Sequence, residues 1–173
     1  DGSQAKKKEM LQFEYTRSAL LNGLKLEARL GVNPYKFGLV GSSDAHTGLA
    51  AMEEENFFGK TAPQEPGPER LTKTFVKNDK IGVAIMDWQV GSSGYAAVWA
   101  TENTREAIFD AMKRRETYAT TGPRMAVRLF GGWDFEPGDA NNRLPAAIGY
   151  GKDVPMGGDL RTAPAGKSPT FLV

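Results

Sequence analysis

The amino-acid sequence predicts an α/β fold that gives way to a β-rich extension. Apolar residues recur at helical spacing over residues 9–30, and a short apolar run at residues 36–41 follows after a turn. A second helical pattern covers residues 104–115, after two further short apolar runs. Helices that alternate with short strands are typical of an α/β repeat. From Gly131 onward glycine and proline recur and helical spacing disappears, which predicts short strands joined by turns.

The composition limits the classes of function that the chain can serve. Among its 173 residues, 22 Lys and Arg oppose 21 Asp and Glu, and a net charge of +1 argues against a nucleic-acid or membrane-surface role. The chain has no cysteine, which excludes disulfides, thiol nucleophiles and cysteine zinc ligands. No apolar run approaches the roughly 20 residues of a membrane-spanning helix. We interpret the basic runs at residues 6–8 and 113–115 as solvated helix flanks.

The first half of the chain is predicted to hold one long helix and two strands. The helix over residues 9–30 should end at Gly31, where glycine is a common C-terminal residue, and a strand is expected over residues 36–41. Prolines make residues 61–70 a surface loop, and β-branched residues predict a strand at residues 81–86.

The second half is predicted to begin with a short strand at residues 96–100. Asn103 is expected to cap the helix over residues 104–115, with Glu106 completing a capping pair. Alternating residues predict an antiparallel strand at residues 125–130, and residues 170–173 look like the start of another.

The candidate metal ligands are Asp44 and His46, which follow the predicted strand at residues 36–41. Loops at the ends of strands are where α/β barrels place their chemistry. A carboxylate oxygen and a neutral imidazole nitrogen can both bind a borderline divalent metal. His46 is the one histidine of the chain, and two ligands do not make a complete site. Serine hydrolysis is not favoured, because Ser92 and Ser93 lie in no G-x-S-x-G motif.

Three consecutive glutamates, Glu53, Glu54 and Glu55, follow the Asp-x-His motif. Such a run is usually a solvated helical face. The functional alternative is that one carboxylate turns back toward Asp44 and His46, as a further ligand or as a group that orients one. Lys60 is interpreted as a surface lysine rather than as a contact for an anionic substrate.

The segment Thr-Thr-Gly-Pro-Arg at residues 120–124 is the candidate substrate-binding loop. Thr120 and Thr121 can present hydroxyl groups to a phosphate-like oxyanion, and Arg124 can clamp it with two parallel hydrogen bonds. The alternative is a plain turn before the next strand, and the residues themselves leave the two possibilities even.

The motif Gly-Ser-Ser-Asp-Ala-His at residues 41–46 and the loop at residues 116–124 resemble the C-terminal half of the PHP (polymerase and histidinol phosphatase) superfamily of metal-dependent hydrolases. The chain is more closely similar to the DUF3604 branch, whose members carry a PHP-like barrel. The resemblance extends over four stretches that cover most of the chain, at residues 15–33, 37–60, 98–133 and 154–173.

The resemblance implies part of a distorted (β/α)7 PHP-like barrel over residues 1–130 and the start of a β-rich extension over residues 131–173. It implies two or three divalent metal ions (Zn, Mn or Fe) and hydrolysis of a phosphoester or related ester by metal-activated water. Asp44 and His46 match two late metal ligands of the family. The family's other ligands, including an early His-x-His motif, lie upstream in its pattern.

The resemblance further implies that the chain is a C-terminal fragment of a larger parent and is inactive alone. Its partners would be the remainder of the parent chain, a small-molecule ester or phosphoester, and further copies bound through exposed barrel edges. The family also allows a periplasmic or secreted parent. The alternative is a non-catalytic binding or scaffold module, in which Asp44 caps a turn and His46 is an ordinary loop histidine.

Overall fold

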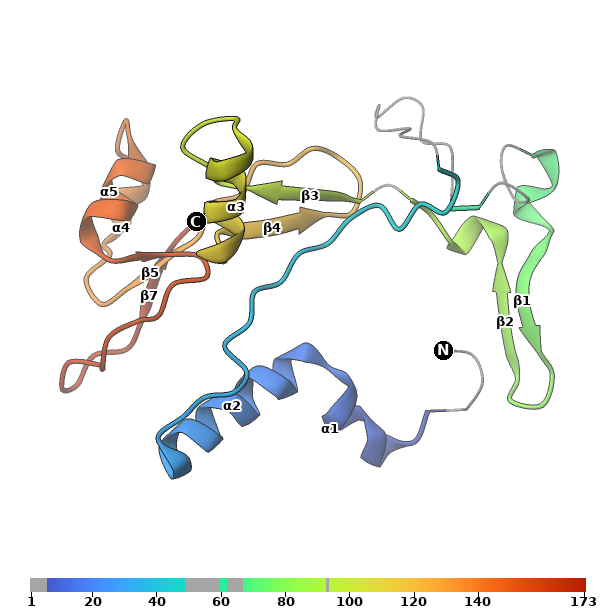
Figure 1. The fold of residues 1–173 in the computed structure, drawn as a ribbon, viewed down its shortest axis with the longest axis horizontal. Coiled ribbons are helices and arrows are strands. Elements are labelled where there is room, and N and C mark those ends of the chain that lie inside the picture. Colours follow the sequence, from blue (N-terminus) through green and yellow to red (C-terminus); the bar gives the residue numbers. More distant parts are fainter. Residues whose placement is uncertain (1–5, 49–59, 62–66, 93) are drawn as a thin grey trace. The chain divides into compact units, whose positions relative to one another are not determined.

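The computed structural model describes residues 6–48, 60–61, 67–92 and 94–173 (Figure 1). These residues form helices and short strands, and all strand pairs are antiparallel. The described part of the chain contains no closed barrel, and the (β/α)7 barrel stays a prediction. Two compact units are formed, one from Asp1–Phe37 and Asp44–Ser93 and the other from Gly38–Ser43 and Gly94–Val173. The predicted domain boundary at residue 130 also stays a prediction.

The first unit begins with two helices where one was predicted. Helix α1 spans Leu11–Glu14 and α2 spans Thr16–Leu30, drawn in blue in Figure 1. Tyr15 lies between them in an extended conformation (φ −109°, ψ 135°), and its carbonyl accepts the first hydrogen bond of α2. Tyrosine and threonine have lower helix propensity than their neighbours, and the break falls at that pair. The prediction of one unbroken helix was therefore wrong.

The predicted end of the long helix is confirmed at Gly31. Gly31 takes a left-handed conformation (φ 75°), and its N–H donates to the carbonyl of Glu27 over 2.8 Å. The chain then folds back, and the side chain of Asn33 packs directly against Gly23. Asn33 Nδ2 donates to Glu27 Oε2 over 3.3 Å. The absence of a side chain at Gly23 makes this close return possible.

A hairpin completes the described secondary structure of the first unit. Strand β1 (Thr74–Asn78) pairs with β2 (Val83–Met86), which confirms the strand predicted near residues 81–86. The chain turns through Gly82 at φ 66°. Asp87 follows β2 in a short 3₁₀ turn, where it is buried and its N–H donates to the carbonyl of Lys73 over 3.0 Å.

The second unit is built on the pair of strands β3 (Tyr95–Val98) and β4 (Thr117–Thr120). Helix α3 (Arg105–Lys113) connects them and buries its alanines. Thr104, not Asn103, caps this helix, because Thr104 Oγ1 accepts a hydrogen bond from the N–H of Ala107 over 3.3 Å. The predicted cap was wrong by one residue.

Residues 38–43 lie along β4 without forming a strand. Thr117 Oγ1 donates to the carbonyl of Leu39 over 2.6 Å, and Gly41 lies against Ala119. Residue numbers increase in the same direction along both segments, so they run parallel. The strand predicted at residues 36–41 was wrong, because the described contact is made by the Thr117 side chain rather than by a backbone ladder.

The end of the chain forms a three-stranded sheet with β5 (Phe130–Gly132) between β6 (Val154–Pro155) and β7 (Thr170–Leu172). Strand β7 confirms the strand predicted at the end of the chain, whereas the β-rich extension as a domain stays a prediction. Helices α4 (Pro137–Ala140) and α5 (Pro145–Lys152) were not predicted. Each begins with a proline, which is favoured at the first helical position although the sequence pattern was interpreted as turns.

The strand predicted at residues 125–130 was wrong except at its last residue. The N–H of Met125 donates to the carbonyl of Pro123 over 2.8 Å, and the indole Nε1 of Trp99 donates to the carbonyl of Val127 over 2.8 Å. A local turn and the Trp99 side chain thus make the hydrogen bonds that these backbone groups would otherwise make with a neighbouring strand. Alternating residues alone could not reveal these competing partners.

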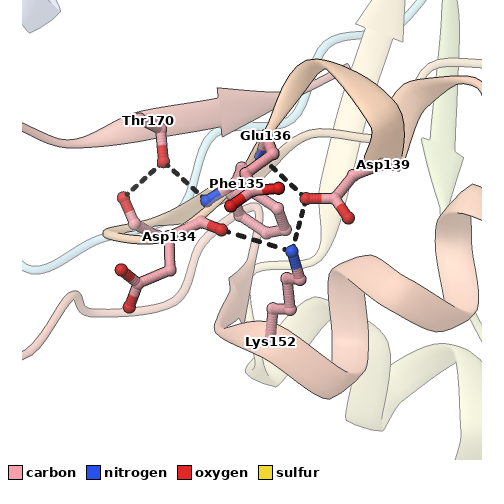
Figure 2. Close-up of polar contacts among 7 residues, drawn as sticks. Asp134, Phe135, Glu136, Asp139, Lys152 and Thr170 are labelled. Atoms are coloured by element: carbon pink, nitrogen blue, oxygen red, sulfur yellow. Dashed lines mark hydrogen bonds and ion pairs between the residues drawn. The ribbon is translucent and has the colours of Figure 1, made fainter.

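A polar cluster ties the C-terminal helices to the sheet (Figure 2). Lys152 of α5 points at α4, where its ammonium bonds Asp139 Oδ2 over 2.6 Å, and it also donates to the carbonyl of Asp134 over 3.2 Å. This hydrogen bond from Lys152, together with that from the N–H of Glu136, lowers the pKa of the Asp139 carboxyl. Thr170 Oγ1 accepts from the N–H of Phe135 over 3.1 Å, so β7 joins the same cluster.

Candidate functional site

Asp44, His46 and Lys60 come together in a loop of the first unit. The N–H of His46 donates to the carbonyl of Lys60 over 2.7 Å, and the Lys60 ammonium bonds Asp44 Oδ2. His46 Nδ1 lies 2.8 Å from the backbone carbonyl of Asp44 and 3.6 Å from its Oδ1. The predicted pair is therefore close in space, and Lys60, interpreted from the sequence as a surface residue, is its third member.

The contacts of His46 define which ring nitrogen carries a proton. A backbone carbonyl only accepts hydrogen bonds, so Nδ1 must be the donor to the Asp44 oxygen. In the neutral ring, the lone pair then belongs to Nε2. Histidine ligands of metals usually donate their second N–H to a carbonyl or carboxylate in this way, which fixes both ring orientation and tautomer.

The backbone of Asp44 is unusual for a residue with a side chain. Its φ of 58° lies in the left-handed region, which aspartate and asparagine tolerate better than most residues. The same residue offers its carbonyl to His46 and its carboxylate to Lys60. A single residue thus organises the loop through both its backbone and its side chain.

The charge of Asp44 is stabilised by its neighbours. The hydrogen bond from Lys60 is the largest cause that lowers the pKa of the Asp44 carboxyl; desolvation opposes it, and the charges of Lys60 and His46 lower the pKa further. The carboxyl is consequently ionised at neutral pH, which is the form that binds a cation. Its side chain is 63% exposed, so a ligand from solvent can reach it.

The described residues fit part of a metal site. The ionised carboxylate of Asp44 and the lone pair on His46 Nε2 are two of the ligand types that a divalent metal ion binds, whereas the protonated Nδ1 is not a ligand. The described ranges contain no group of three or more His, Asp or Glu side chains that could hold a metal ion. Glu53, Glu54 and Glu55, the proposed further ligands or orienting groups, lie outside the described residues.

The predicted substrate-binding residues lie at the end of β4 in the second unit. Thr120 is 6% exposed, and its Oγ1 is buried without a hydrogen-bond partner in the described structure. Thr121 is exposed on the loop that follows. The guanidinium carbon of Arg124 lies 5.1 Å from the centre of the Tyr95 ring, and its Nη2 lies 3.4 Å from the Tyr95 hydroxyl.

Tyr95 is the residue of this group that the sequence did not suggest. It begins β3 and lies directly opposite Thr120 in the antiparallel ladder. The neighbouring Gly94 allows a close approach of chain segments, since a Cβ there would lie 2.6 Å from the Ser42 carbonyl oxygen and 3.0 Å from that of Thr120. An aromatic residue at the start of a short strand carries no pattern that would mark it as functional.

A second polar cluster of the same unit is structural. Glu116 is buried, its Oε2 accepts from Arg114 Nε and Nη2 over 3.3 and 3.2 Å, and its Oε1 accepts from the Tyr150 hydroxyl. Arg128 stacks over the Trp99 ring, 3.7 Å from its centre. Both carboxylate oxygens of Glu116 accept hydrogen bonds from within the protein, so we interpret the cluster as structural.

The comparisons with known proteins identify one family. A family model described as "Protein of unknown function (DUF3604)" matches residues 1–173. No curated protein and no solved structure matches the sequence. In the part of the chain that the structure describes, no helix has the length and apolar character needed to cross a membrane.

Proposed function

The chain belongs to the DUF3604 family, and from this premise we propose that it is the C-terminal part of a PHP-like metal-dependent hydrolase. Asp44 and His46 are the proposed ligands of a divalent zinc, manganese or iron ion. In the complete parent, the reaction would be hydrolysis of a phosphoester or related ester. A bound metal ion supplies this chemistry by lowering the pKa of a coordinated water.

The observation that supports the proposal most directly is the hydrogen bond from His46 Nδ1 to the Asp44 carbonyl. It orients the ring and leaves the Nε2 lone pair free of a proton, as metal-binding histidines require.

The two oxygens of the Asp44 carboxylate have different neighbours. The ammonium occupies Oδ2, whereas Oδ1 faces His46. Asp44 can therefore bind a cation through Oδ1 while Lys60 holds Oδ2 in place. Lys60 would act as a positioning residue for the ligand, and Glu53, Glu54 or Glu55 remains a proposed further partner.

The test measures metal content and hydrolysis in the complete parent protein, with Asp44→Asn and His46→Gln as the variants. Each should lower the affinity for Zn²⁺ or Mn²⁺ by at least about 10-fold, because each removes a ligand. Hydrolysis of p-nitrophenyl phosphate should fall with metal content. Asp79→Asn is the matched control, since Asp79 is an exposed acid of the same unit that forms an ion pair with Lys77. Unchanged metal content and activity in Asp44→Asn would overturn the assignment.

The second candidate function is a non-catalytic binding or scaffold module. The ion pair between Lys60 and Asp44 favours it, because a lysine that neutralises the carboxylate also suits a purely structural turn. In that case Lys60→Met should loosen the loop, and neither Asp44→Asn nor His46→Gln should change metal content. Under the hydrolase proposal, both ligand variants should lose metal, and Lys60→Met, which removes only a positioning residue, should weaken the metal affinity less than either of them.

A further inference from the structure

We propose that Thr120 and Arg124 bind the phosphoryl group of an anionic ester and that Tyr95 positions Arg124 for this contact. The inference deepens the proposed function and rests on it for the reaction, although phosphate binding itself can be tested separately. All three residues belong to the second unit. The subsite therefore depends on no contact between the units.

The strand register places Tyr95 and Thr120 on one face. The two residues are directly opposite in the β3–β4 ladder. Directly opposite residues of an antiparallel pair point to the same side of the sheet, with Cβ atoms about 5 Å apart. The side chain of Thr120 therefore leaves the same face of the sheet as the Tyr95 ring, over which the Arg124 guanidinium lies.

Thr120 offers a hydrogen-bond donor that the protein itself does not use. Its Oγ1 is buried and has no partner in the described structure, whereas most buried polar side-chain atoms have at least one. A hydroxyl can donate one hydrogen bond, and an oxygen of a bound oxyanion would accept it. This unsatisfied group points to a ligand more directly than the exposed Thr121 does.

Arg124 provides the charge, and Tyr95 restricts where that charge lies. The guanidinium is over the Tyr95 ring at 5.1 Å, a distance at which a cation is attracted to the aromatic face. Its planar fork suits two oxygens of a phosphate or carboxylate. The fork together with a separate hydroxyl donor provides for three oxygens, which a phosphoryl group has and a carboxylate lacks.

The first experiment measures binding of inorganic phosphate to the chain of residues 1–173 by isothermal titration calorimetry. Arg124→Met should weaken binding by at least about 10-fold, because it removes a charge-assisted pair. Arg124→Lys should also weaken it, because lysine keeps the charge but lacks the fork. Arg161→Met is the matched control, an exposed arginine of the same unit, and should leave binding unchanged.

Two further pairs of variants test the roles of Thr120 and Tyr95. Thr120→Val should weaken phosphate binding several-fold without loss of thermal stability, because the buried hydroxyl has no protein partner to lose. Thr120→Ser should retain binding. Tyr95→Phe keeps the ring and should bind nearly as the parent, whereas Tyr95→Leu should weaken binding. In the Arg124→Met background, Tyr95→Leu should have no further effect if Tyr95 acts through Arg124.

The proposal is overturned if phosphate does not bind, if Arg161→Met weakens binding as much as Arg124→Met, or if acetate binds as tightly as phosphate. Sulfate should bind, because it shares the tetrahedral arrangement of oxygens. The outcome is separable from that for the hydrolase. Asp44→Asn should leave phosphate binding intact. If phosphate binds but the parent shows no metal-dependent hydrolysis, the hydrolase proposal has failed. If hydrolysis depends on metal but phosphate does not bind, the phosphate-binding proposal has failed.

Discussion

Tyr150 is a residue whose ionisation is controlled by its surroundings. Burial is the main cause that raises the pKa of its hydroxyl above 10.0, and the hydrogen bond to Glu116 raises it further. The folded protein therefore favours protonated Tyr150 more than the unfolded chain does. Its contribution to the free energy of unfolding is complete below pH 10.0 and is lost as the pH rises through the higher pKa of the folded state.

We expect Tyr150→Phe to remove this pH dependence. At pH 7 the variant should be less stable by about 1 kcal/mol, because one oxygen of buried Glu116 loses its donor. Above pH 10.0 the difference from the parent should shrink, since phenylalanine cannot ionise. Urea denaturation of both proteins between pH 7 and 11 measures the two curves. A constant difference across that range would contradict the assigned pKa shift.

Some residues of the candidate sites could be predicted from the sequence, but the residues that contact them from distant parts of the chain could not. Asp44 and His46 are two positions apart, so their proximity follows from the chain itself. Lys60 reaches Asp44 across a 16-residue separation, and Tyr95 reaches Arg124 across 29. Such contacts depend on how the fold brings distant loops and strands together. The local spacing of residue types in the sequence does not predict them.

At the level of elements, the N-terminus of α3 shows how one hydroxyl selects a helix start. Both Asn103 and Thr104 are residue types that cap helices. Thr104 is the cap because its backbone is extended (φ −123°, ψ 158°) and its Oγ1 accepts from the N–H of Ala107. Two adjacent candidates with similar preferences cannot be distinguished by the sequence alone.

Removing this cap should destabilise the second unit measurably. Thr104→Val preserves shape but removes the acceptor, and we expect it to lower the free energy of unfolding by about 1 kcal/mol. Thr104→Ser should restore most of that loss. Asn103→Ala is the control and should have little effect. Thermal and urea denaturation supply the comparison, and equal losses in Thr104→Val and Asn103→Ala would show that the cap is assigned to the wrong residue.

The predictions of strands were correct where a strong local sequence pattern lies beside another strand with which it can pair. The strand near residues 81–86 pairs with β1, and the strand near residues 170–173 pairs with β5. The strand predicted at residues 125–130 has a regular alternation, but Trp99 and a local turn occupy its backbone groups. A local pattern therefore predicted a strand correctly only where a neighbouring strand was available.

At the scale of the whole molecule, each compact unit is assembled from two separate segments of the chain. The chain passes from one unit to the other after Phe37, Ser43 and Ser93. Residues 38–43 belong with the C-terminal half because they lie against β4, about 78 positions further along. The sequence predicted that this apolar run would be a strand, and the run instead lies parallel to β4 without a backbone ladder.

The hydrogen bond from Thr117 to Leu39 is the described side-chain link that joins these distant segments, so its loss should loosen residues 38–43. Thr117→Val preserves shape and strand preference but removes the donor. We expect faster amide hydrogen exchange across residues 38–43 and a loss of about 0.5–1.5 kcal/mol in the free energy of unfolding.

The β1–β2 hairpin provides the internal control for this change, because it belongs to the other unit and its exchange should stay the same. Thr117→Ser keeps the hydroxyl and should exchange as the parent does. If Thr117→Val left exchange across residues 38–43 unchanged, the attachment of this segment would depend on packing at Gly38 and Gly41 instead. The two glycines lie against Arg115 and Ala119, so alanine at either position would then be the substitution that releases the segment.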